Sequence, residues 1–245
     1  MSSDIETLCA VSDATWPPAH QSRVGPWTIR EGQGGGKRVS SASTGSPVGE
    51  ADLAQAEAAM RALEQVPLFR VGAGQRRLDQ LLAGRGYRVI DPVNGWLGPL
   101  APLVAEPLPR GHVFAIWEPL VIQTEIWAEG GIGAGRLAVM ARAPGPKTAI
   151  LSRLEQTPAA TAFVAIHAGI AMVHALTVAP ACRRHGVARL VMRQAAHWAR
   201  KNGAARVAAL CTTDNAPANA LYASLGLSVV GQYHYRIAEK GPSHD

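Results

Sequence analysis

The sequence predicts an α/β fold in which helices flank a mixed sheet. Strands and helices alternate between residues 148 and 237 in the order β–β–β–α–β–α–β–β, which is typical of such folds. One helix–glycine–strand pattern occurs twice, ending at Val89 in the first half and at Val229 in the second. The composition supports a folded chain, because 47% of the 245 residues are hydrophobic.

Residues 1–100 are expected to form the smaller of two αβ units. Apolar spacing and the positions of Gly and Pro predict helices at 5–14, 51–65 and 76–83, and strands at 26–30, 39–42, 68–71, 87–90 and around 96. The glycines from Gly32 to Gly36 do not form a P-loop, because only three residues separate the outer two and Arg38 occupies the hydroxyl position. A hairpin leading into the strand at 39–42 is preferred.

Four prolines between residues 97 and 111 predict an extended linker at 101–111. The second, larger unit is then expected to span residues 112–245. Its predicted helices lie near 118–127, 136–143, 187–201 and 215–226, and its strands near 148–154, 161–167, 170–178, 206–211, 228–230 and 232–237. The glycine-rich segment 130–135 is either a plain surface loop or a movable cover over a site.

A strand, a tight loop and a helix are predicted over residues 172–201. Pro180 has no N–H to donate and ends the strand, Gly186 lies where the helix begins, and Asn202-Gly203 ends it. The first turn of a helix presents unpaired N–H groups, and a glycine there lets a phosphate approach the backbone. The stretch is a candidate pyrophosphate site, although an ordinary strand–helix connection fits the same residues equally well.

Two motifs give the second unit a family resemblance. Arg183-x-x-Gly186-x-Ala188 resembles the Arg/Gln-x-x-Gly-x-Gly/Ala signature of the GNAT N-acetyltransferase superfamily. The family's downstream Asn–Ala–Leu-Tyr–Leu-Gly-Phe element is matched, with Leu in the Phe place, by Asn215-x-x-Ala218-x-x-Leu221-Tyr222-x-x-Leu225-Gly226-Leu227. The resemblance covers residues 148–237. It implies a twisted, mostly antiparallel mixed sheet, acetyl-CoA binding and acyl transfer to an amine.

The first unit is a candidate degenerate copy of the same fold. In the repeated pattern, Leu82 stands where Tyr222 does and Gln75 stands where Asn215 does. No phosphate-loop signature occurs before residue 100, so a copy without a cofactor site and a coincidental αβ pattern both remain open.

The resemblance also implies roles for individual residues. The strand residues Leu176, Thr177 and Val178 would pair with the pantetheine arm, and a backbone N–H would polarise the thioester oxygen. The pyrophosphate would lie on Arg183, Arg184, His185, Gly186, Val187, Ala188 and Arg189. Tyr222 would be the general acid for the departing thiolate, and Asn215 would contact the cofactor. The alternatives are an aromatic that only packs and an asparagine that only caps a helix.

The general base is harder to assign. Peptide N-terminal acetyltransferases of this family often carry a glutamate five residues before the motif asparagine, where this chain has Leu210. That departure argues against a peptide N-terminus as the acceptor. His174 is the candidate base, because histidine can accept a proton at neutral pH. Glu118, Glu125 and His234 are remoter candidates. A strand histidine without a role and proton transfer through water are the alternatives.

Charge and cysteine content limit the partners. Residues 1–111 hold eleven Lys and Arg against eleven Asp and Glu, and residues 112–245 hold thirteen against seven. The net charge of +6 therefore lies in the half with the candidate phosphate loop, which suits coenzyme A. The arginines are dispersed, so nucleic acid is not expected. No membrane span, secretory signal or metal-ligand spacing is seen, and three separated cysteines suggest a reducing cytoplasm.

The sequence thus predicts an acetyl-CoA-dependent N-acetyltransferase that uses no metal and acts on a small-molecule or protein amine, with its active site in residues 112–245. A homodimer is an open expectation. The alternatives are a non-catalytic CoA-binding sensor or interaction module, and a transferase for longer acyl or aminoacyl groups.

Overall fold

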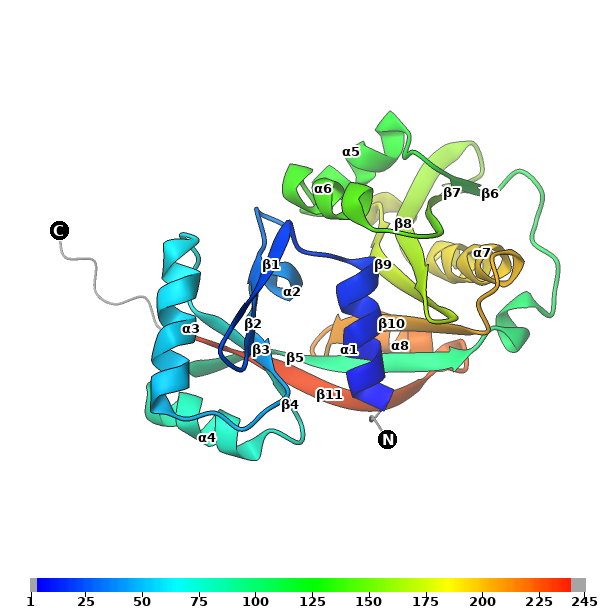
Figure 1. Ribbon diagram of the computed structural model, residues 1–245. Coiled ribbons are helices and arrows are strands. Elements are labelled where there is room, and N and C mark those ends of the chain that lie inside the picture. Colours follow the sequence, from blue (N-terminus) through cyan, green and yellow to red (C-terminus); the bar gives the residue numbers. More distant parts are fainter. Residues whose placement is uncertain (1–3, 239–245) are drawn as a thin grey trace.

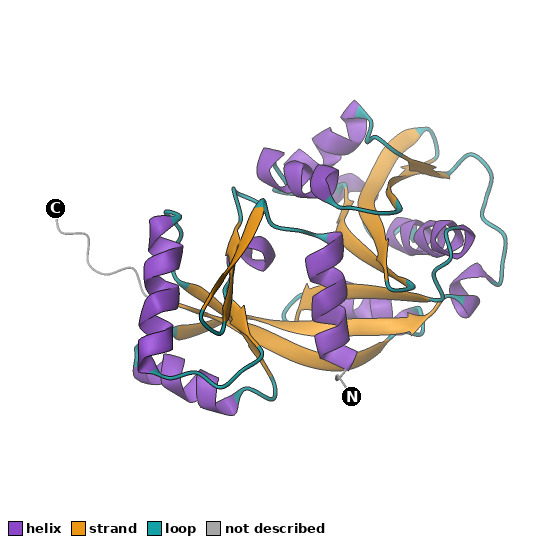
Figure 2. Ribbon diagram, in the orientation of Figure 1, coloured by secondary structure: helices purple, strands orange, loops and turns teal. Residues whose placement is uncertain are grey.

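The computed structural model describes residues 4–238 (Figures 1 and 2). The helices are α1 (Asp4–Thr15), α2 (Lys37–Ser40), α3 (Glu50–Ala62), α4 (Arg76–Gly84), α5 (Val121–Glu129), α6 (Ala134–Arg142), α7 (Val187–Lys201) and α8 (Ala216–Ser224), with 3₁₀ turns η1 (Ala101–Val104) and η2 (Pro180–Cys182). The strands are β1 (His20–Val24), β2 (Trp27–Glu31), β3 (Ser43–Thr44), β4 (Leu68–Gly72), β5 (Arg88–Pro99), β6 (Val113–Ile116), β7 (Lys147–Leu154), β8 (Thr157–His167), β9 (Ile170–Val178), β10 (Arg206–Thr212) and β11 (Ser228–Ile237).

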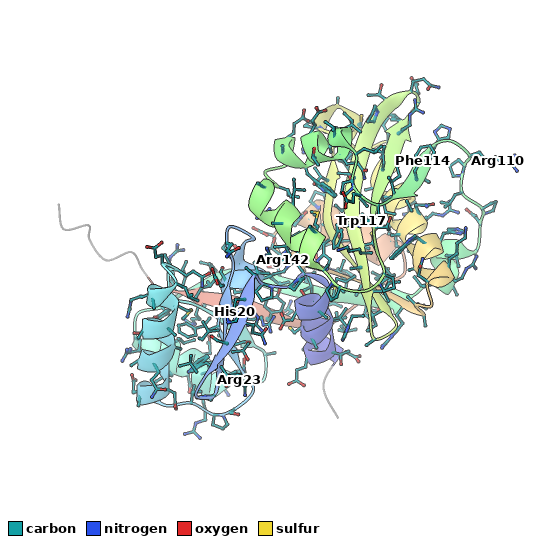
Figure 3. All side chains as sticks on the ribbon, turned by 45° about the horizontal axis from the view of Figure 1, so that its top comes forward. His20, Arg23, Arg110, Phe114, Trp117 and Arg142 are labelled. Carbon is teal, nitrogen blue, oxygen red and sulfur yellow. The ribbon has the colours of Figure 1, made fainter. Side chains whose placement is uncertain are left out.

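One eight-stranded sheet runs through both halves of the chain, in the order β4-β11-β5-β10-β9-β8-β7-β6. Neighbouring strands are antiparallel except for β9 and β10, which are parallel. A small second sheet holds β1, β2 and β3. Figure 3 shows His20 and Arg23 on β1 at one end of the molecule, and Arg110 and Phe114 at the other. The mixed, mostly antiparallel sheet flanked by helices confirms the predicted fold class.

The strands β5 and β11 join the two halves. β5 comes from the first hundred residues but pairs with β10 and β11, and β11 comes from the end of the chain but pairs with β4 and β5. Each half therefore places its last long strand beside strands of the other half. The division into units 1–100 and 112–245 stays a prediction. The predicted linker at 101–111 begins with η1 and leads from β5 to β6.

Alternating side chains of the central strands bury opposite faces of the sheet. On one face, Val173 and Ala209 belong to a core that includes Val191 of α7. On the other face, Met172 and Ala208 pack in a core with Leu8 and Val11 of α1. This alternation follows from the period of two in a β-strand. The sheet therefore lies between α1 on one side and α7 on the other.

Asp13 ties α1 to the first half of the sheet. Its carboxylate accepts from Nη2 of Arg30 on β2 at 2.7 Å and from Nη1 of Arg70 on β4 at 2.9 Å. Burial raises the pKa of Asp13, but the two guanidinium groups outweigh it and hold this pKa below its usual value. α1 is thus tied to β2 and β4.

Three sequence predictions need correction. The strand predicted at 39–42 is wrong, because residues 37–40 form the short helix α2. Val39 is the apolar residue of this helix and is fully buried, so its burial does not reflect the alternation of a strand. Residues 87–96 contain one long strand, β5, where two were predicted. Residues 228–237 likewise form one strand, β11, whose register against β5 shifts between Val229 and Gly231.

Candidate active site

The strands β9 and β10 separate part-way along their length. They pair only over residues 170–173 and 206–209, although the strands continue to 178 and 212. Ala175 has a φ of 52° beyond the point of separation, and the register between β8 and β9 shifts next to it. The predicted pantetheine-binding residues 176–178 therefore present an edge toward β10 that carries no strand pairing. An open strand edge of this kind can pair with an extended ligand.

The loop after β9 enters α7 through a left-handed turn. Gly186 has a φ of 76° and a ψ of 1°, a conformation that glycine adopts without steric cost. The backbone N–H groups of residues 184–189 donate to no acceptor within residues 4–238. Arg183, Arg184 and His185 are exposed around them. Free N–H groups at a helix N-terminus, with cations nearby, favour an anion.

The side chain of Arg189 hydrogen-bonds to the neighbouring helix, α8. Its Nη2 donates to Oγ of Ser224 at 2.8 Å, and its Nη1 donates to the Ser224 carbonyl oxygen at 3.4 Å. These bonds join the first turn of α7 to the end of α8. The structure therefore brings the helix that carries Tyr222 to the edge of the candidate phosphate loop.

Tyr222 lies on α8 and is only 6% exposed. Its ring packs against Trp96 of β5, with the ring centroids 6.0 Å apart. Burial raises the pKa of Tyr222 well above its usual value, with a smaller contribution from Cys211. The phenol is therefore protonated at neutral pH, which is the form that a proton donor needs.

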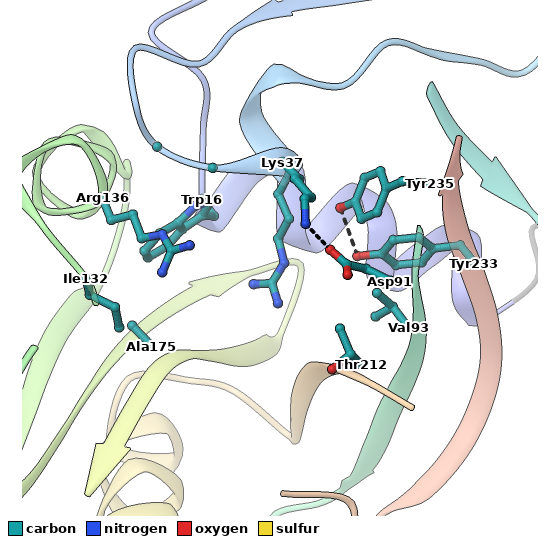
Figure 4. Close-up of a pocket in the computed structure, with 13 residues that line it drawn as sticks. Trp16, Lys37, Asp91, Val93, Ile132, Arg136, Ala175, Thr212, Tyr233 and Tyr235 are labelled. Carbon is teal, nitrogen blue, oxygen red and sulfur yellow. Dashed lines mark hydrogen bonds and ion pairs between the residues drawn. The ribbon is translucent and has the colours of Figure 1, made fainter. Parts of the chain in front are cut away.

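A cavity of about 490 Å³ opens between the two halves of the chain (Figure 4). Ala175 of β9 and Thr212 of β10 line it, so it adjoins the place where these strands separate. The remaining lining residues come from both halves: Trp16, Gly35, Gly36, Lys37, Arg38, Asp91, Val93, Ile132, Arg136, Tyr233 and Tyr235. Lys37 and Asp91 form an ion pair at its rim. Cavities of this size accommodate small-molecule substrates.

Comparison with known proteins identifies the family. Residues 123–227 match the model of the acetyltransferase (GNAT) family. These residues of the protein are a GNAT acetyltransferase domain. The domain makes the protein an acyltransferase, and it confirms the resemblance that the two sequence motifs indicated. GNAT enzymes generally use acetyl-CoA and act on amines.

Individual relatives of this GNAT protein extend over nearly the whole chain. The uncharacterised N-acetyltransferase YobR of Bacillus subtilis (strain 168) is 25% identical over 245 residues, covering 96% of this chain and 98% of the relative. A GCN5-related N-acetyltransferase from Kribbella flavida has a TM-score of 0.70 at 18% identity, covering 96% and 95% of the two chains. A tandem GNAT protein from the clavulanic acid biosynthesis pathway has a TM-score of 0.65 at 15% identity, covering 96% and 88%. The fold, including its first half, is thus shared with solved GNAT structures.

His174, the predicted base of this GNAT site, is 2% exposed on β9. Its Nε2 lies 2.9 Å from Oγ1 of Thr15, which itself donates to the Val11 carbonyl oxygen at 2.7 Å. His174 Nε2 therefore carries the proton, and the bare Nδ1 faces Nη1 of Arg38 at 3.3 Å. Burial, and then the charge of Arg38, lowers the pKa of His174 well below its usual value. Both ring nitrogens have partners, which favours a positioning role over proton transfer; the base assignment stays a prediction.

Asn215 caps α8, as its alternative interpretation suggested. Its Oδ1 accepts from the Ala218 N–H at 3.1 Å. This bond does not test the predicted cofactor contact, since the side chain is exposed at the helix end.

Asn219 is a residue of the site that sequence reasoning missed. Its Oδ1 accepts from Nδ2 of Asn94 at 2.8 Å and from Nε1 of Trp96 at 3.0 Å, and its Nδ2 donates to the Thr212 carbonyl oxygen at 3.0 Å. It thereby links β5, the end of β10 and the helix of Tyr222. No sequence signal pointed to it, because Asn94 and Trp96 lie more than a hundred positions away.

The part of the chain that the structure describes holds no group of three or more His, Cys, Asp or Glu that could bind a metal ion. Within the same residues, no helix is both long enough and apolar enough to cross a membrane.

Proposed function

We propose that this GNAT protein is an N-acetyltransferase that moves an acetyl group from acetyl-CoA to the primary amine of a second substrate. The observation that carries the proposal is the separation of β9 from β10 directly before a helix N-terminus with free backbone N–H groups. The separation leaves room for an extended arm, and the N–H groups favour phosphate. The two segments follow one another in the chain, which supports the proposal that they bind one ligand, coenzyme A.

In the proposed complex, residues 184–189 bind the pyrophosphate through backbone N–H groups, helped by the positive charges of Arg183 and Arg184. Leu176, Thr177 and Val178 pair with the pantetheine arm along the open edge of β9. A backbone N–H on this edge donates to the thioester oxygen, where negative charge develops during the reaction.

The amine enters from the cavity side, where Ala175 and Thr212 line the wall. Its nitrogen attacks the thioester carbonyl carbon, the carbon–sulfur bond breaks, and the thiolate takes the proton of Tyr222. The amine loses its proton to solvent through the open cavity, and a proton from solvent then restores Tyr222. Asp91, the carboxylate on the cavity wall, is paired with Lys37.

The test is calorimetric titration with acetyl-CoA. The native protein is compared with the double variant Arg184→Glu/Gly186→Asp, which places negative charge in the loop. Arg200→Glu/Gly203→Asp is the matched control: it changes an exposed arginine and a left-handed glycine (φ 83°) at the opposite end of α7. The proposal expects micromolar binding to the native protein and to the control, and loss of binding in the loop variant.

Absence of acetyl-CoA binding to the native protein would refute the proposal. Binding without thiol release in the presence of any amine would instead support a non-catalytic CoA-binding module. Preferential binding of bulkier thioesters in competition with acetyl-CoA would support transfer of a longer acyl or aminoacyl group.

A further inference from the structure

The charges around the cavity are unequal. Three of its lining residues are cationic, Lys37, Arg38 and Arg136, and one is acidic, Asp91. The ion pair between Lys37 and Asp91 accounts for one of each. Neither Arg38 nor Arg136 forms an ion pair with any carboxylate of residues 4–238. Two guanidinium charges on the cavity wall are therefore without a counter-charge from the part of the chain that the structure describes.

Arg38 is held in place by neutral groups. Its Nη2 donates to the Leu210 carbonyl oxygen at 2.9 Å, and its Nη1 lies 3.3 Å from Nδ1 of His174. The bond from His174 to Thr15 on α1 fixes the imidazole behind it. These partners orient the guanidinium without neutralising it. Since the side chain is partly buried, its remaining N–H donors gain more from an anion than they would in open water.

Arg136 reaches the same cavity from α6. Its guanidinium lies along the backbone at Gly36, where an added Cβ would be 3.5 Å from Nε and 3.6 Å from Nη2. The two glycine-rich segments meet beside it: a Cβ added to Gly135 would be only 2.6 Å from the carbonyl carbon of Gly34. Small residues at this contact let α6 approach the loop that leads to Arg38. In Figure 4, Arg136 lies beside Trp16 on one side of the cavity, and the Lys37–Asp91 pair lies toward the opposite side of the cavity.

We infer that the amine acceptor carries a carboxylate, which Arg38 and Arg136 recognise. The inference rests on the proposed function, since it concerns the second substrate of that reaction. Guanidinium groups bind carboxylates through paired N–H donors, and the two unpaired charges repel a polyamine. Trp16, Val93 and Ile132 add an apolar wall for the body of the acceptor. An amino acid with an apolar or aromatic side chain has all three groups that this site would recognise: an amine, a carboxylate and an apolar body.

The test measures binding of the acetylated product, so that it does not depend on turnover. Titrations in the presence of CoA compare N-acetyl-leucine and N-acetyl-phenylalanine with their uncharged carboxamides, and with the N-acetyl derivative of O-phosphoethanolamine as the phosphate arm. Each ligand is titrated into the native protein, Arg136→Gln and Arg110→Gln. Arg110 is exposed on the loop before β6, at the far edge of the molecule (Figure 3).

We expect at least one N-acetyl amino acid to bind ten or more times tighter than its carboxamide. We also expect Arg136→Gln to weaken the binding of that N-acetyl amino acid at least tenfold and to leave the binding of its carboxamide unchanged. Arg110→Gln should bind both ligands as the native protein does. Equal binding of acid and carboxamide, no binding of either acid, or native affinity in Arg136→Gln would overturn the inference. Tighter binding of the phosphate ligand would overturn the assignment to a carboxylate. Failure of the proposed function is seen separately, as absence of acetyl-CoA binding or of thiol release with any amine.

Discussion

Arg38 and Leu210 are 172 positions apart, yet Nη2 of Arg38 donates to the Leu210 carbonyl oxygen at 2.9 Å. Leu210 lies on β10 one residue beyond the last pair with β9. A side chain from the first half of the chain therefore reaches the point at which the GNAT sheet opens. The first half is part of the candidate active site, even though it carries no recognisable cofactor motif.

Tyr222→Phe should lower kcat by at least tenfold and leave the affinity for acetyl-CoA unchanged. The phenyl ring keeps its packing against Trp96, while the protonated hydroxyl that would serve the departing thiolate is lost. Thiol release under saturating acetyl-CoA measures the effect. Tyr87→Phe is the matched control, because Tyr87 is also buried but bonds Glu57 in the first half at 2.9 Å. Unchanged turnover in Tyr222→Phe would remove this residue from the mechanism.

Asn219→Ala should destabilise the protein by about 2–3 kcal/mol, because it leaves the Asn94 amide and the Trp96 N–H without their shared acceptor. Asn215→Ala removes only a helix cap and should cost about 1 kcal/mol. Urea unfolding measures both values. Acetyl-CoA titration of the stable Asn215→Ala variant then separates the two interpretations of that residue: unaltered affinity would mean that Asn215 is a cap alone.

Stability should fall as the pH decreases below about 6.5. The pKa of His174 in the folded protein lies well below that of an exposed histidine, so the unfolded chain binds the extra proton first. The loss is about 1.4 kcal/mol for each pH unit below 6.5, until the pH approaches the folded pKa. Urea unfolding at pH 7.5, 6.5 and 5.5 measures it. His174→Gln should flatten this dependence, and His20→Gln, on the exposed strand β1, should not. The same slope in all three proteins would contradict the buried, neutral histidine.

The two halves should fold together rather than separately. Residues 112–245 alone would leave β10 and β11 without β5, and residues 1–100 alone would leave β4 and β5 without β11. Circular dichroism and thermal unfolding of the separate fragments should show no cooperative transition, and mixing them should restore one. The control is the full chain cleaved after folding at a protease site inserted in the exposed loop near Arg110. A cooperative transition in the isolated fragment 112–245 would contradict the prediction that each half needs strands of the other half in order to fold.

The sequence determined the part of the fold that depends on neighbouring residues. The alternation of β7, β8 and β9, the amphipathic face of α7, and the glycine and asparagine at helix ends are local patterns, and each element was predicted within a few residues. The short helix α2 was not, because four residues carry too little periodicity to distinguish a helix from a strand. The candidate phosphate loop was also readable, since its N–H groups come from consecutive residues.

Only the tertiary structure decided what surrounds that loop. Contacts such as Arg38 to Leu210, Asn219 to Trp96 and Gly34 to Gly135 join residues that are far apart in the chain, and no local pattern encodes them. The place of β5 between β11 and β10 is also a long-range choice, made by the pairing of strands from both halves. His174 shows the difference most clearly. Its position on a strand could be read from the sequence, but its neutral state depends on α1 and Arg38, which the fold brings to it from the first forty residues.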